Sequence, residues 1–409
     1  MVRCQRFSAP RLLSTHGMAE PFDLVILGGG CAGLSLSMAL AAQGRACPRT
    51  LVIESRIEYT NDRTWCYWND PAAPENFPIQ HRWQTMRVAH AGQSVSIDCG
   101  STPYHMLAAQ DFYATAQASI DRQPNIELKR GTAVVGEPRH NSGVWQIRTT
   151  SGDLTARSVV DTRPGQPPRL NGATLWQSFY GQEIECSAAV FDPLSMDLMN
   201  FLAPNRQDVP FVYLLPVTPT RALVEVTVFG AAPLAPRALS ARLEAAVAQR
   251  VGGASFTVMR HEHGILPMGL NASPNSAHKS WAKIGLMAGG ARPSTGYAFQ
   301  RIQRWAGECA HTLVRAGHPI GHRPDPLPVR LMDRIFLDVL RADPGRGAAL
   351  FFSLFGSADP ARVIRFLSGN GGMVDGLAVV KAMPVAPFLG AAFAMARRRG
   401  PNSEVGSVA

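Results

Sequence analysis

Three things are scarce in this sequence: long apolar runs, closely spaced cysteines and charged side chains. The apolar run at residues 382–396 spans 15 residues and contains Pro384 and Pro387, whereas a membrane-spanning helix needs about 20. The seven cysteines are scattered and never spaced Cys-x-x-Cys. Their pattern argues against a disulfide framework or a zinc site and favours a reducing, cytoplasmic setting.

Charged residues make up only 17% of the chain, yet the net charge is +10. A basic excess points to nucleic acid or to an anionic membrane surface as a partner. The sequence contains no zinc finger, basic helix or aromatic-interleaved basic stripe, so we expect no nucleic-acid partner. A surface poor in charge suits contact with apolar material, and we expect peripheral association with a membrane.

The N-terminal head, residues 1–20, is basic but lacks the apolar stretch of about 7–15 residues that a secretory signal contains. It resembles a transit peptide in its charge. We expect Met18 to be the natural start, because the first predicted strand begins four residues later, at Phe22.

A glycine-rich turn follows that strand. Residues 28–33, Gly-Gly-Gly-Cys-Ala-Gly, fit the pattern Gly-x-Gly-x-x-Gly, which is weak by itself. Here it lies between an aliphatic strand at 22–27 and a predicted helix at 34–42, and Glu54 ends the next strand 21 residues after Gly33. This context is typical of a doubly wound α/β domain that binds an adenine dinucleotide.

Each part of the turn has a physical task. Gly28 allows the tight turn, Gly30 lets the backbone approach a pyrophosphate, and Gly33 lets helix pack on strand. The helix N-terminus offers unpaired N–H groups and positive potential to the phosphates, and Glu54 is placed to accept hydrogen bonds from a ribose.

A second glycine cluster at residues 285–290 favours FAD over NAD as the cofactor. It follows a long predicted β insertion, at the point where the chain would return to the flavin. The predicted cofactor-binding residues are Gly28, Gly29, Gly30, Cys31, Ala32, Gly33, Glu54, Gly289 and Gly290. Asp161 and Arg163, after two valines, indicate either the end of an inner strand of this domain or an ion pair in a surface turn.

The organisation along the chain follows from these patterns. The predicted fold class is α/β: a Rossmann-like FAD-binding domain with an inserted antiparallel β-sheet that binds substrate, and C-terminal helices. We assign residues 21–75, 100–170 and 255–325 to the FAD-binding domain and residues 76–99 and 171–254 to the β layer. Residues 326–396 form the helical part and 397–409 a basic tail, while residues 1–20 are a disordered or non-native extension.

Further segments resemble those of the bacterial lycopene β-cyclase family. They occur in the family's order, and the resemblance covers nearly the whole chain. They are Asn-Asp-Arg-Thr-Trp-Cys-Tyr-Trp at 61–68, Phe-Val-Tyr-Leu-Leu-Pro-Val-Thr-Pro-Thr-Arg at 211–221, Gly-Ile-Leu-Pro-Met-Gly at 264–269, Ala-Arg-Pro-Ser-Thr-Gly-Tyr at 291–297 and Leu-Met-Asp-Arg-Ile-Phe-Leu at 331–337. The Arg-Pro-Ser-Thr-Gly-Tyr and Arg-Thr-Trp-Cys-Tyr-Trp stretches are the most specific.

This resemblance implies an intramolecular lyase of the isomerase type that acts on lycopene or a related acyclic carotene. A proton adds at the terminal double bond, the neighbouring double bond attacks the cation, and loss of a ring proton leaves a β-ionone ring. The family requires reduced FAD, with NAD(P)H as the electron source, although no electrons are consumed. A reduced, anionic flavin near a developing cation is electrostatically favourable.

The resemblance also implies an acidic motif with two adjacent glutamates. Here Glu225 matches the first and Val226 stands at the second, so only one acid remains. Glu225 lies in an apolar strand, where burial raises a carboxyl pKa and holds the proton that a general acid needs. Alternation groups Glu225 with Leu223 and Thr227. The alternative is a glutamate on the solvated face of an edge strand.

The aromatic stretch at 65–68 suggests a substrate site. Trp65, Tyr67 and Trp68 are suited to stabilise a cation, by roughly 0.5–2 kcal/mol per contact, although packing in the core explains them equally well. We expect Asp333 to be a charge on a helix surface. His261, Glu262 and His263 form a cluster of possible ligands. The two histidines share a strand face without a third ligand in view, so no metal site is predicted.

Other functions remain open at this stage. A flavin monooxygenase or isoprenoid reductase of similar architecture is one alternative, but hydroxylases usually place an acid in the second glycine cluster, and residues 288–292 contain none. A non-catalytic flavoprotein that binds carotenoid is another. The apolar tail predicts a membrane-facing surface or an ordinary core helix.

Overall fold

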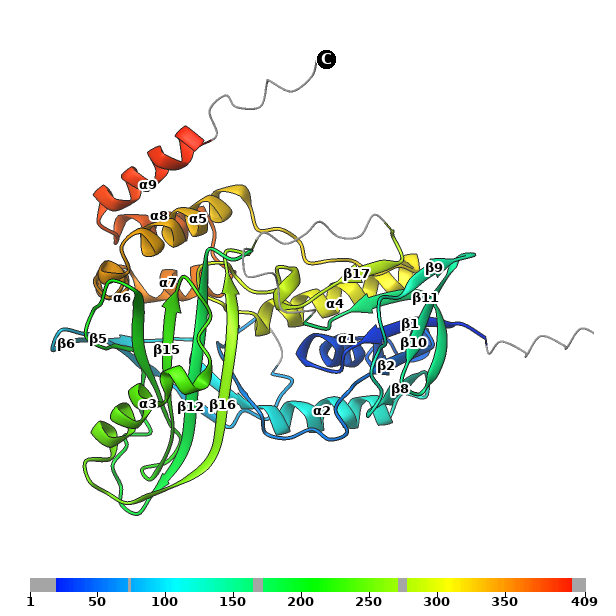
Figure 1. Cartoon of the computed structure of the whole chain (residues 1–409), viewed down its shortest axis with the longest axis horizontal. Coiled ribbons are helices and arrows are strands. Elements are labelled where there is room, and N and C mark those ends of the chain that lie inside the picture. Colours follow the sequence, from blue (N-terminus) through cyan, green and yellow to red (C-terminus); the bar gives the residue numbers. More distant parts are fainter. Residues whose placement is uncertain (1–19, 73–74, 165–171, 271–277, 399–409) are drawn as a thin grey trace, which may run out of the picture.

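The computed structural model describes residues 20–72, 75–164, 172–270 and 278–398, which form three β-sheets and the helices that pack on them (Figure 1). In Figure 1 one large sheet lies on the right, the second on the left, and the C-terminal helices cover the upper left. The predictions for residues 1–19 and for the tail beyond residue 398 lie outside the described residues.

The right-hand sheet is a parallel sheet extended by an antiparallel hairpin. Its strands run in the order β8 (Ile126–Lys129), β2 (Thr50–Ile53), β1 (Phe22–Leu27), β11 (Gly152–Asp161), β10 (Val144–Thr149) and β9 (Arg139–Asn141), with β17 (Trp281–Lys283) also paired to β11. Strands β1, β2, β8, β11 and β17 pair in parallel. The helices of this part are α1 (Cys31–Ala41), α2 (Ala109–Asp121) and α4 (Phe299–Ala316), and a 3-10 turn, η1 (Gly44–Ala46), follows α1. The predicted dinucleotide-binding architecture is therefore confirmed.

The second sheet is mainly antiparallel. Its order is β16 (Phe256–Met268), β12 (Leu175–Cys186), β15 (Arg221–Gly230), β14 (Asp208–Pro216), β13 (Ser195–Phe201), β5 (Thr85–His90) and β6 (Gln93–Asp98). Helix α3 (Pro236–Val251) covers one face. The prediction that placed residues from 255 onward in the FAD-binding domain is corrected at its start, because β16 pairs with β12 along nearly its whole length.

Strand β15 lies inside this sheet, paired with β12 on one side and β14 on the other. Its residues alternate as predicted: Val224, Val226 and Val228 pack in a core cluster with α3, while Leu223 and Phe229 join a different cluster on the opposite face. Glu225 belongs to that opposite face and is buried. The alternative of a solvated edge strand is therefore wrong.

A small third sheet stands between the two large ones and consists of β3 (Thr64–Trp68), β7 (Tyr104–Ala108) and β4 (His81–Trp83) in the order β3-β7-β4. All five residues of β7 are buried. Tyr104 and Met106 belong to the core of the second sheet, whereas Leu107 belongs to the core of the dinucleotide domain. This sheet therefore joins the two cores.

The C-terminal helices complete the core of the second sheet. They are α5 (Leu327–Ala342), α6 (Gly347–Ser357), α7 (Pro360–Leu367), α8 (Met373–Lys381) and α9 (Val385–Arg398), with a 3-10 turn, η3 (Pro344–Arg346), before α6. In the described part of the chain no single helix has the length and apolarity to span a membrane. Helix α8 and residues 385–393 of α9 pass that test only together, as a pair bent by 113°.

Asp333 corrects a prediction. It is not a surface charge but lies buried on α5, where its Oδ1 accepts hydrogen bonds from Ser294 at 2.7 Å and from Arg292 at 3.2 Å. Arg292 is itself buried, stacks over the ring of Phe366 and donates to the Phe366 carbonyl. The apolar stripe of α5 indicated a helix, but a buried charge on it is visible only once its partner on another segment is known.

Substitution of Asp333 by asparagine should lower the free energy of unfolding by about 3–5 kcal/mol, because it leaves the guanidinium of Arg292 buried without its counter-charge. Chemical denaturation measures the change. Glu308→Gln is the matched control, since Glu308 forms an exposed pair with Arg323 and should change stability by less than about 1 kcal/mol. Equal effects of the two substitutions would contradict the structural role of the buried pair.

Candidate functional site

The glycine-rich turn lies between β1 and α1, as predicted. Gly28 has a φ of +99°, which favours glycine, and a Cβ at Gly33 would lie 2.0 Å from the carbonyl oxygen of Gly28. At Gly30, by contrast, a Cβ would meet no atom within 4 Å. Helix α1 has no acidic residue in its first turn and no side-chain cap at Gly30. Backbone N–H groups at the start of α1 therefore face open space, as a pyrophosphate site requires.

Glu54 is buried beside this turn at the end of β2. Its Oε2 accepts hydrogen bonds from the backbone N–H of Gly29 at 2.9 Å and from Arg56 at 3.1 Å. Its Oε1 accepts from the backbone N–H of Arg56 at 2.8 Å and from the Ser55 hydroxyl at 3.2 Å. These hydrogen bonds outweigh burial and lower the pKa of Glu54. A ribose hydroxyl would bind this carboxylate by replacing one of the two side-chain donors, Arg56 or Ser55.

The second glycine cluster returns to the same edge. The backbone N–H of Ile284 donates to the carbonyl of Asp161 at 2.8 Å, next to β1. The turn that follows, η2 (Leu286–Ala288), is closed by Gly289, whose φ is +82°. Asp161 is buried at the end of β11 and accepts two hydrogen bonds from the guanidinium of Arg163 and one from its backbone N–H, so it is both the inner strand end and an ion-pair partner.

His322 supports this cluster and was not anticipated from the sequence. Its Nε2 accepts a hydrogen bond from the backbone N–H of Gly285 at 3.2 Å. Burial and the charge of Arg301 lower the pKa of His322 to about 4, so the ring is neutral and has a lone pair for this bond. A Cβ at Gly290 would lie 2.8 Å from the same nitrogen, which explains the glycine there.

Glu225 faces the interior between the second sheet, β3 and the C-terminal helices. Thr227 donates a hydrogen bond to its Oε1 at 2.7 Å. Burial raises the pKa of Glu225 well above its ordinary value, and the neighbouring charge of Glu262 adds to the rise. Both effects favour the protonated form of this carboxyl group.

Glu262 shares this face because of the strand register. Gly181 on β12 is paired with Glu225 on one side and with Glu262 on the other. Directly paired residues point to the same face of a sheet, and a Cβ at Gly181 would lie 3.1 Å from the Cβ of Glu225. The missing side chain at Gly181 thus leaves room for the two carboxyl groups to meet.

Two arginines accompany the carboxylates on this face. Arg260 contacts Glu262 Oε2 and Glu183 Oε2, both at 2.5 Å, and Arg221 contacts Glu183 Oε1 at 2.6 Å. Two positive charges thus balance the charges of Glu183 and Glu262. Glu225 is left with a hydroxyl as its hydrogen-bond donor, and the attraction of Arg260 is the smallest influence on its pKa.

Strand β3 divides the predicted aromatic residues between two faces. The hydroxyl of Thr64 donates to Glu262 at 2.7 Å, Cys66 lies close enough for Glu225 to influence its pKa, and Trp68 packs on Tyr104 and Tyr297. Trp65 and Tyr67 point the other way and pack against Phe112 and Phe299. The structure therefore brings Trp68, but not Trp65 or Tyr67, to the face that carries Glu225.

Three tyrosines line the space next to Glu225. Tyr213 is paired with Glu225 across β14 and β15 and donates a hydrogen bond to the hydroxyl of Tyr104 at 3.0 Å. The hydroxyls of Tyr104 and Tyr297 lie 3.3 Å apart. Burial raises the pKa of all three phenols, so they remain neutral. Tyr297 is the last residue of the segment that begins at the second glycine cluster. This segment therefore connects the dinucleotide edge with the three tyrosines near Glu225.

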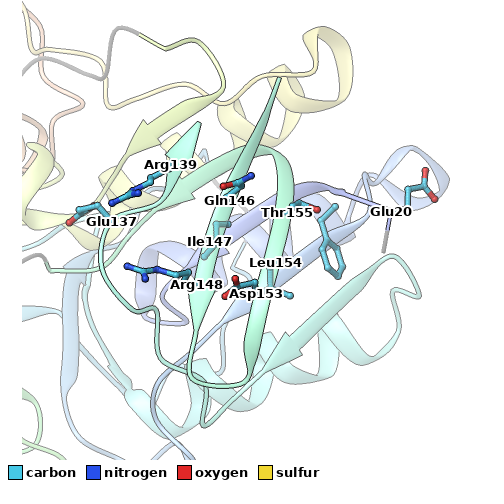
Figure 2. Close-up of a pocket in the computed structure, with 10 residues that line it drawn as sticks. Glu20, Glu137, Arg139, Gln146, Ile147, Arg148, Asp153, Leu154 and Thr155 are labelled. Atoms are coloured by element: carbon cyan, nitrogen blue, oxygen red, sulfur yellow. The ribbon is translucent and has the colours of Figure 1, made fainter. Parts of the chain in front are cut away.

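The described cavities differ in their relation to this site. A cavity of 480 Å³ lies on the outer surface of β9–β11 (Figure 2) and is lined mainly by polar and charged residues, none of them part of the site. A small cavity of 20 Å³ lies beside Trp68 and Tyr297. Cys66, Tyr67 and Phe299 also line it. Glu225 itself lines neither of these cavities.

Comparison with known sequences identifies the family. Residues 23–393 match the family profile described as lycopene cyclase protein. The chain belongs to the lycopene cyclase family. This lycopene cyclase family member is 26% identical over 392 residues to lycopene β-cyclase from Pantoea ananas, across 91% of this chain and 98% of that protein. It is also 26% identical to lycopene β-cyclase from a Paracoccus species, across 90% of this chain and 95% of that protein.

Solved structures share the fold at low sequence identity. A geranylgeranyl bacteriochlorophyll reductase-like protein from Thermoplasma acidophilum superposes with a TM-score of 0.57 at 13% identity, covering 90% of this chain and 96% of that one. The p-nitrophenol 4-monooxygenase from Pseudomonas putida gives 0.54 at 13% identity, covering 90% and 98%. The architecture of this lycopene cyclase family member is therefore that of flavin-dependent reductases and monooxygenases.

Several site residues were not found by reasoning from the sequence. Glu262 was considered only as part of a histidine cluster, and Arg260, Tyr104 and His322 were not considered. One signal was present: Glu262 lies just before the segment at 264–269 that resembles the family. The strand register that pairs it with Gly181 cannot be read from one sequence.

Proposed function

We propose that this protein is a lycopene β-cyclase that closes β-ionone rings at the ends of an acyclic carotenoid. The observation that carries the proposal is the burial of Glu225 on an apolar and aromatic face, where burial raises the pKa of its carboxyl group. A general acid needs its proton at working pH, and an apolar substrate needs a dry site. The step is a transfer of that proton to the terminal double bond, followed by attack of the neighbouring double bond and loss of a ring proton.

The surroundings of Glu225 suit a cationic reaction. Trp68 and the three tyrosines Tyr104, Tyr213 and Tyr297 offer ring faces, which stabilise a nearby positive charge by roughly 0.5–2 kcal/mol each. The buried ring of Trp68 packs on Tyr104 and Tyr297. A carbocation exposed to water would be captured as an alcohol, so a dry site favours ring closure.

The residues of the glycine turn fit FAD as the cofactor. The open space at Gly30 and the free start of α1 would hold the pyrophosphate, and Glu54 would hold the adenosine ribose. Gly289 and Gly290, at the same edge, would lie against the flavin end. When bound and reduced, FAD would supply negative charge near the cation, with NAD(P)H as the source of electrons.

The fold alone is equally compatible with a monooxygenase or an isoprenoid reductase. Two features favour the cyclase. The segment 288–292 contains no acid of the kind that hydroxylases usually place there, and Glu225 lies buried on an apolar and aromatic face, where an acid can start a cationic ring closure. The burial of Glu225 also argues against a non-catalytic carotenoid-binding protein.

We further propose that α8 and α9 bind the surface of an anionic membrane. The exposed apolar residues of α8 recur at helix spacing on one face, as do those of α9. They are Met373, Val374, Leu377 and Val380 on α8, and Val385, Leu389 and Phe393 on α9, each at least 49% exposed. Lys381 and the run Arg397–Arg398–Arg399 add positive charge to this end of the chain. Such a surface would let carotenoid pass from the lipid into the protein.

Glu225→Gln should abolish cyclisation in lycopene-accumulating cells, with a loss of about 10²–10⁴-fold in rate, because the amide has no acidic proton to donate. Pigment extracted from cells with the unaltered protein should change from red to orange or yellow and should contain β-ionone rings by chromatography and mass spectrometry. Val226→Ala, on the other face of the strand, is the control and should retain activity.

Unchanged lycopene in cells with the unaltered protein would overturn the proposed function. An oxygenated or hydrogenated pigment in its place would support a monooxygenase or a reductase. Full activity of Glu225→Gln would leave the cyclase assignment intact but remove Glu225 as its acid.

Gly30→Ala and Gly33→Ala form a matched pair for the cofactor site. Gly30→Ala should fold normally but bind FAD at least about tenfold more weakly, because its methyl group takes the space of the pyrophosphate. Gly33→Ala should destabilise the fold itself, by about 1–3 kcal/mol or more, since the methyl group would overlap the Gly28 carbonyl. Flavin absorbance and thermal melting separate the two effects. Normal FAD affinity in Gly30→Ala would place the cofactor elsewhere.

The triple substitution of Val385, Leu389 and Phe393 by glutamine tests the membrane surface. Binding to vesicles rich in phosphatidylglycerol should fall at least about tenfold, because each side chain loses roughly 1.5–3 kcal/mol of apolar transfer energy. Flotation measures the bound fraction. Ile57→Gln and Leu194→Gln, which remove exposed apolar side chains elsewhere, should not change it. Undiminished flotation of the triple variant would exclude α9 as the lipid contact.

A further inference from the structure

The position of the family's second acid cannot serve Glu225 in this protein. Val226 stands there, and its side chain packs in the apolar cluster beneath α3, on the face of β15 opposite to Glu225. A carboxylate at 226 would thus lie on the wrong side of the sheet. A second carboxyl group for Glu225 has to come from another strand.

Glu262 meets that requirement. It is 3% exposed, lies two strands away on β16, and is brought to Glu225 across Gly181, which is paired with both residues. The two carboxyl groups thus lie on one face of the sheet, and the charge of Glu262 is close enough to raise the pKa of Glu225. Two such groups can form a hydrogen bond with each other only when one of them carries a proton.

The proton belongs on Glu225, because the positive partners lie on Glu262. Arg260 contacts Glu262 Oε2 at 2.5 Å, and the Thr64 hydroxyl donates to the same oxygen at 2.7 Å. Arg260 also donates to the Thr64 oxygen at 2.6 Å, which closes a ring of hydrogen bonds around one carboxylate oxygen. These contacts hold the carboxyl group of Glu262 in place, whereas Glu225 has no basic side chain bonded to it.

We propose that Glu262 is a positioning residue for Glu225: its carboxylate, held by Arg260 and Thr64, accepts the hydrogen bond of the protonated Glu225 and so replaces the second acid that the chain lacks at Val226. This inference rests on the proposed cyclase function. Glu262 orients the proton of Glu225 and keeps it in place until substrate arrives.

The proton balance of the reaction is closed within this pair. The O–H bond of Glu225 breaks as a C–H bond forms at the terminal double bond, and both carboxylates are then negative beside the carbocation. The neighbouring double bond donates its electron pair to form the ring. A ring C–H bond then breaks, its electrons form the new double bond, and the proton returns to Glu225. No oxidant or reductant is consumed.

Other titratable or charged groups face Glu225 or its partners. They are Arg260, Glu183, Arg221, Cys66, Tyr104, Tyr213 and Tyr297. Burial raises the pKa of Cys66 and of the tyrosines above their ordinary values, so these groups stay neutral. The arginines stay charged at all relevant pH values.

Infrared difference spectroscopy of the purified full-length flavoprotein tests the pair without reference to turnover. The C=O band of a protonated carboxyl group should persist at neutral pH, disappear in Glu225→Gln, and titrate with a midpoint well above that of ordinary glutamate. In Glu262→Gln we expect this midpoint to fall by roughly 1–3 pH units, because a like charge that disfavours ionisation is removed. Glu262→Asp should largely restore it.

The pH dependence of cyclisation provides the second measurement. Activity that needs protonated Glu225 is lost as the pH rises through its pKa, so this decline should move to lower pH in Glu262→Gln by the same amount as the infrared midpoint. The control is Glu183→Gln, which also removes a partner of Arg260 but does not touch Glu225, and it should leave both midpoints in place. A purely structural effect would lower activity at every pH without moving the midpoint.

The outcomes separate the two proposals. A neutral-pH carboxyl band that survives in Glu225→Gln, or an unmoved midpoint in folded Glu262→Gln, would overturn the role of Glu262 even if the protein cyclises lycopene. If Glu262→Gln does not fold, a midpoint near that of ordinary glutamate in the unaltered protein would overturn it as well. A displaced midpoint in a protein that forms no β-ionone ring would support the pair and refute the cyclase function.

Discussion

The burial of one carboxyl group without a basic side chain bonded to it is the constraint on which the site depends. Moving a charged carboxylate out of water is costly, and the group then keeps its proton instead. Here two arginines lie on the same face, but the strand register places them in contact with Glu183 and Glu262 instead of Glu225. An arginine bonded directly to Glu225 would lower the pKa of that carboxyl group and remove its ability to donate a proton. The distribution of charge matters more than its amount.

The architecture brings this group and the cofactor edge together through one segment. Residues 284–297 begin at the carboxyl end of the parallel sheet, where Ile284 bonds to Asp161, and end at Tyr297. The hydroxyl of Tyr297 lies 3.3 Å from that of Tyr104, which accepts a hydrogen bond from Tyr213, the strand partner of Glu225. Glycines at 285, 289 and 296, all with positive φ, let the segment turn sharply between these two places. The small sheet containing β3 performs a similar task, because its two faces belong to different cores.

The sequence alone was sufficient for those parts of the protein that depend on local patterns. The strand at 22–27 appears where it was predicted, and so does the alternation of β15 that turns Glu225 away from Val226. The helix predicted at 34–42 is present but begins three residues earlier, at Cys31. What could not be predicted depends on pairings between distant segments. The apolar pattern around Asp333 does not indicate its ion pair with Arg292. The residues around Glu262 do not indicate that it is paired with Gly181. The strand β16 was assigned to the wrong domain because its partner β12 lies about 80 residues earlier. Trp65, Tyr67 and Trp68 were treated as one group, although alternation along β3 divides them.

The buried contact between Arg292 and Asp333 has a consequence for how this chain can be divided. Arg292 follows the second glycine cluster, and Asp333 lies on the first of the C-terminal helices. A polypeptide that stops before α5 would therefore expose not only an apolar surface but also a guanidinium group surrounded by the hydrocarbon of its own core. The C-terminal helices therefore cannot be exchanged or removed as a separate module. An insertion is more easily tolerated in loops outside the stretch between Arg292 and Asp333.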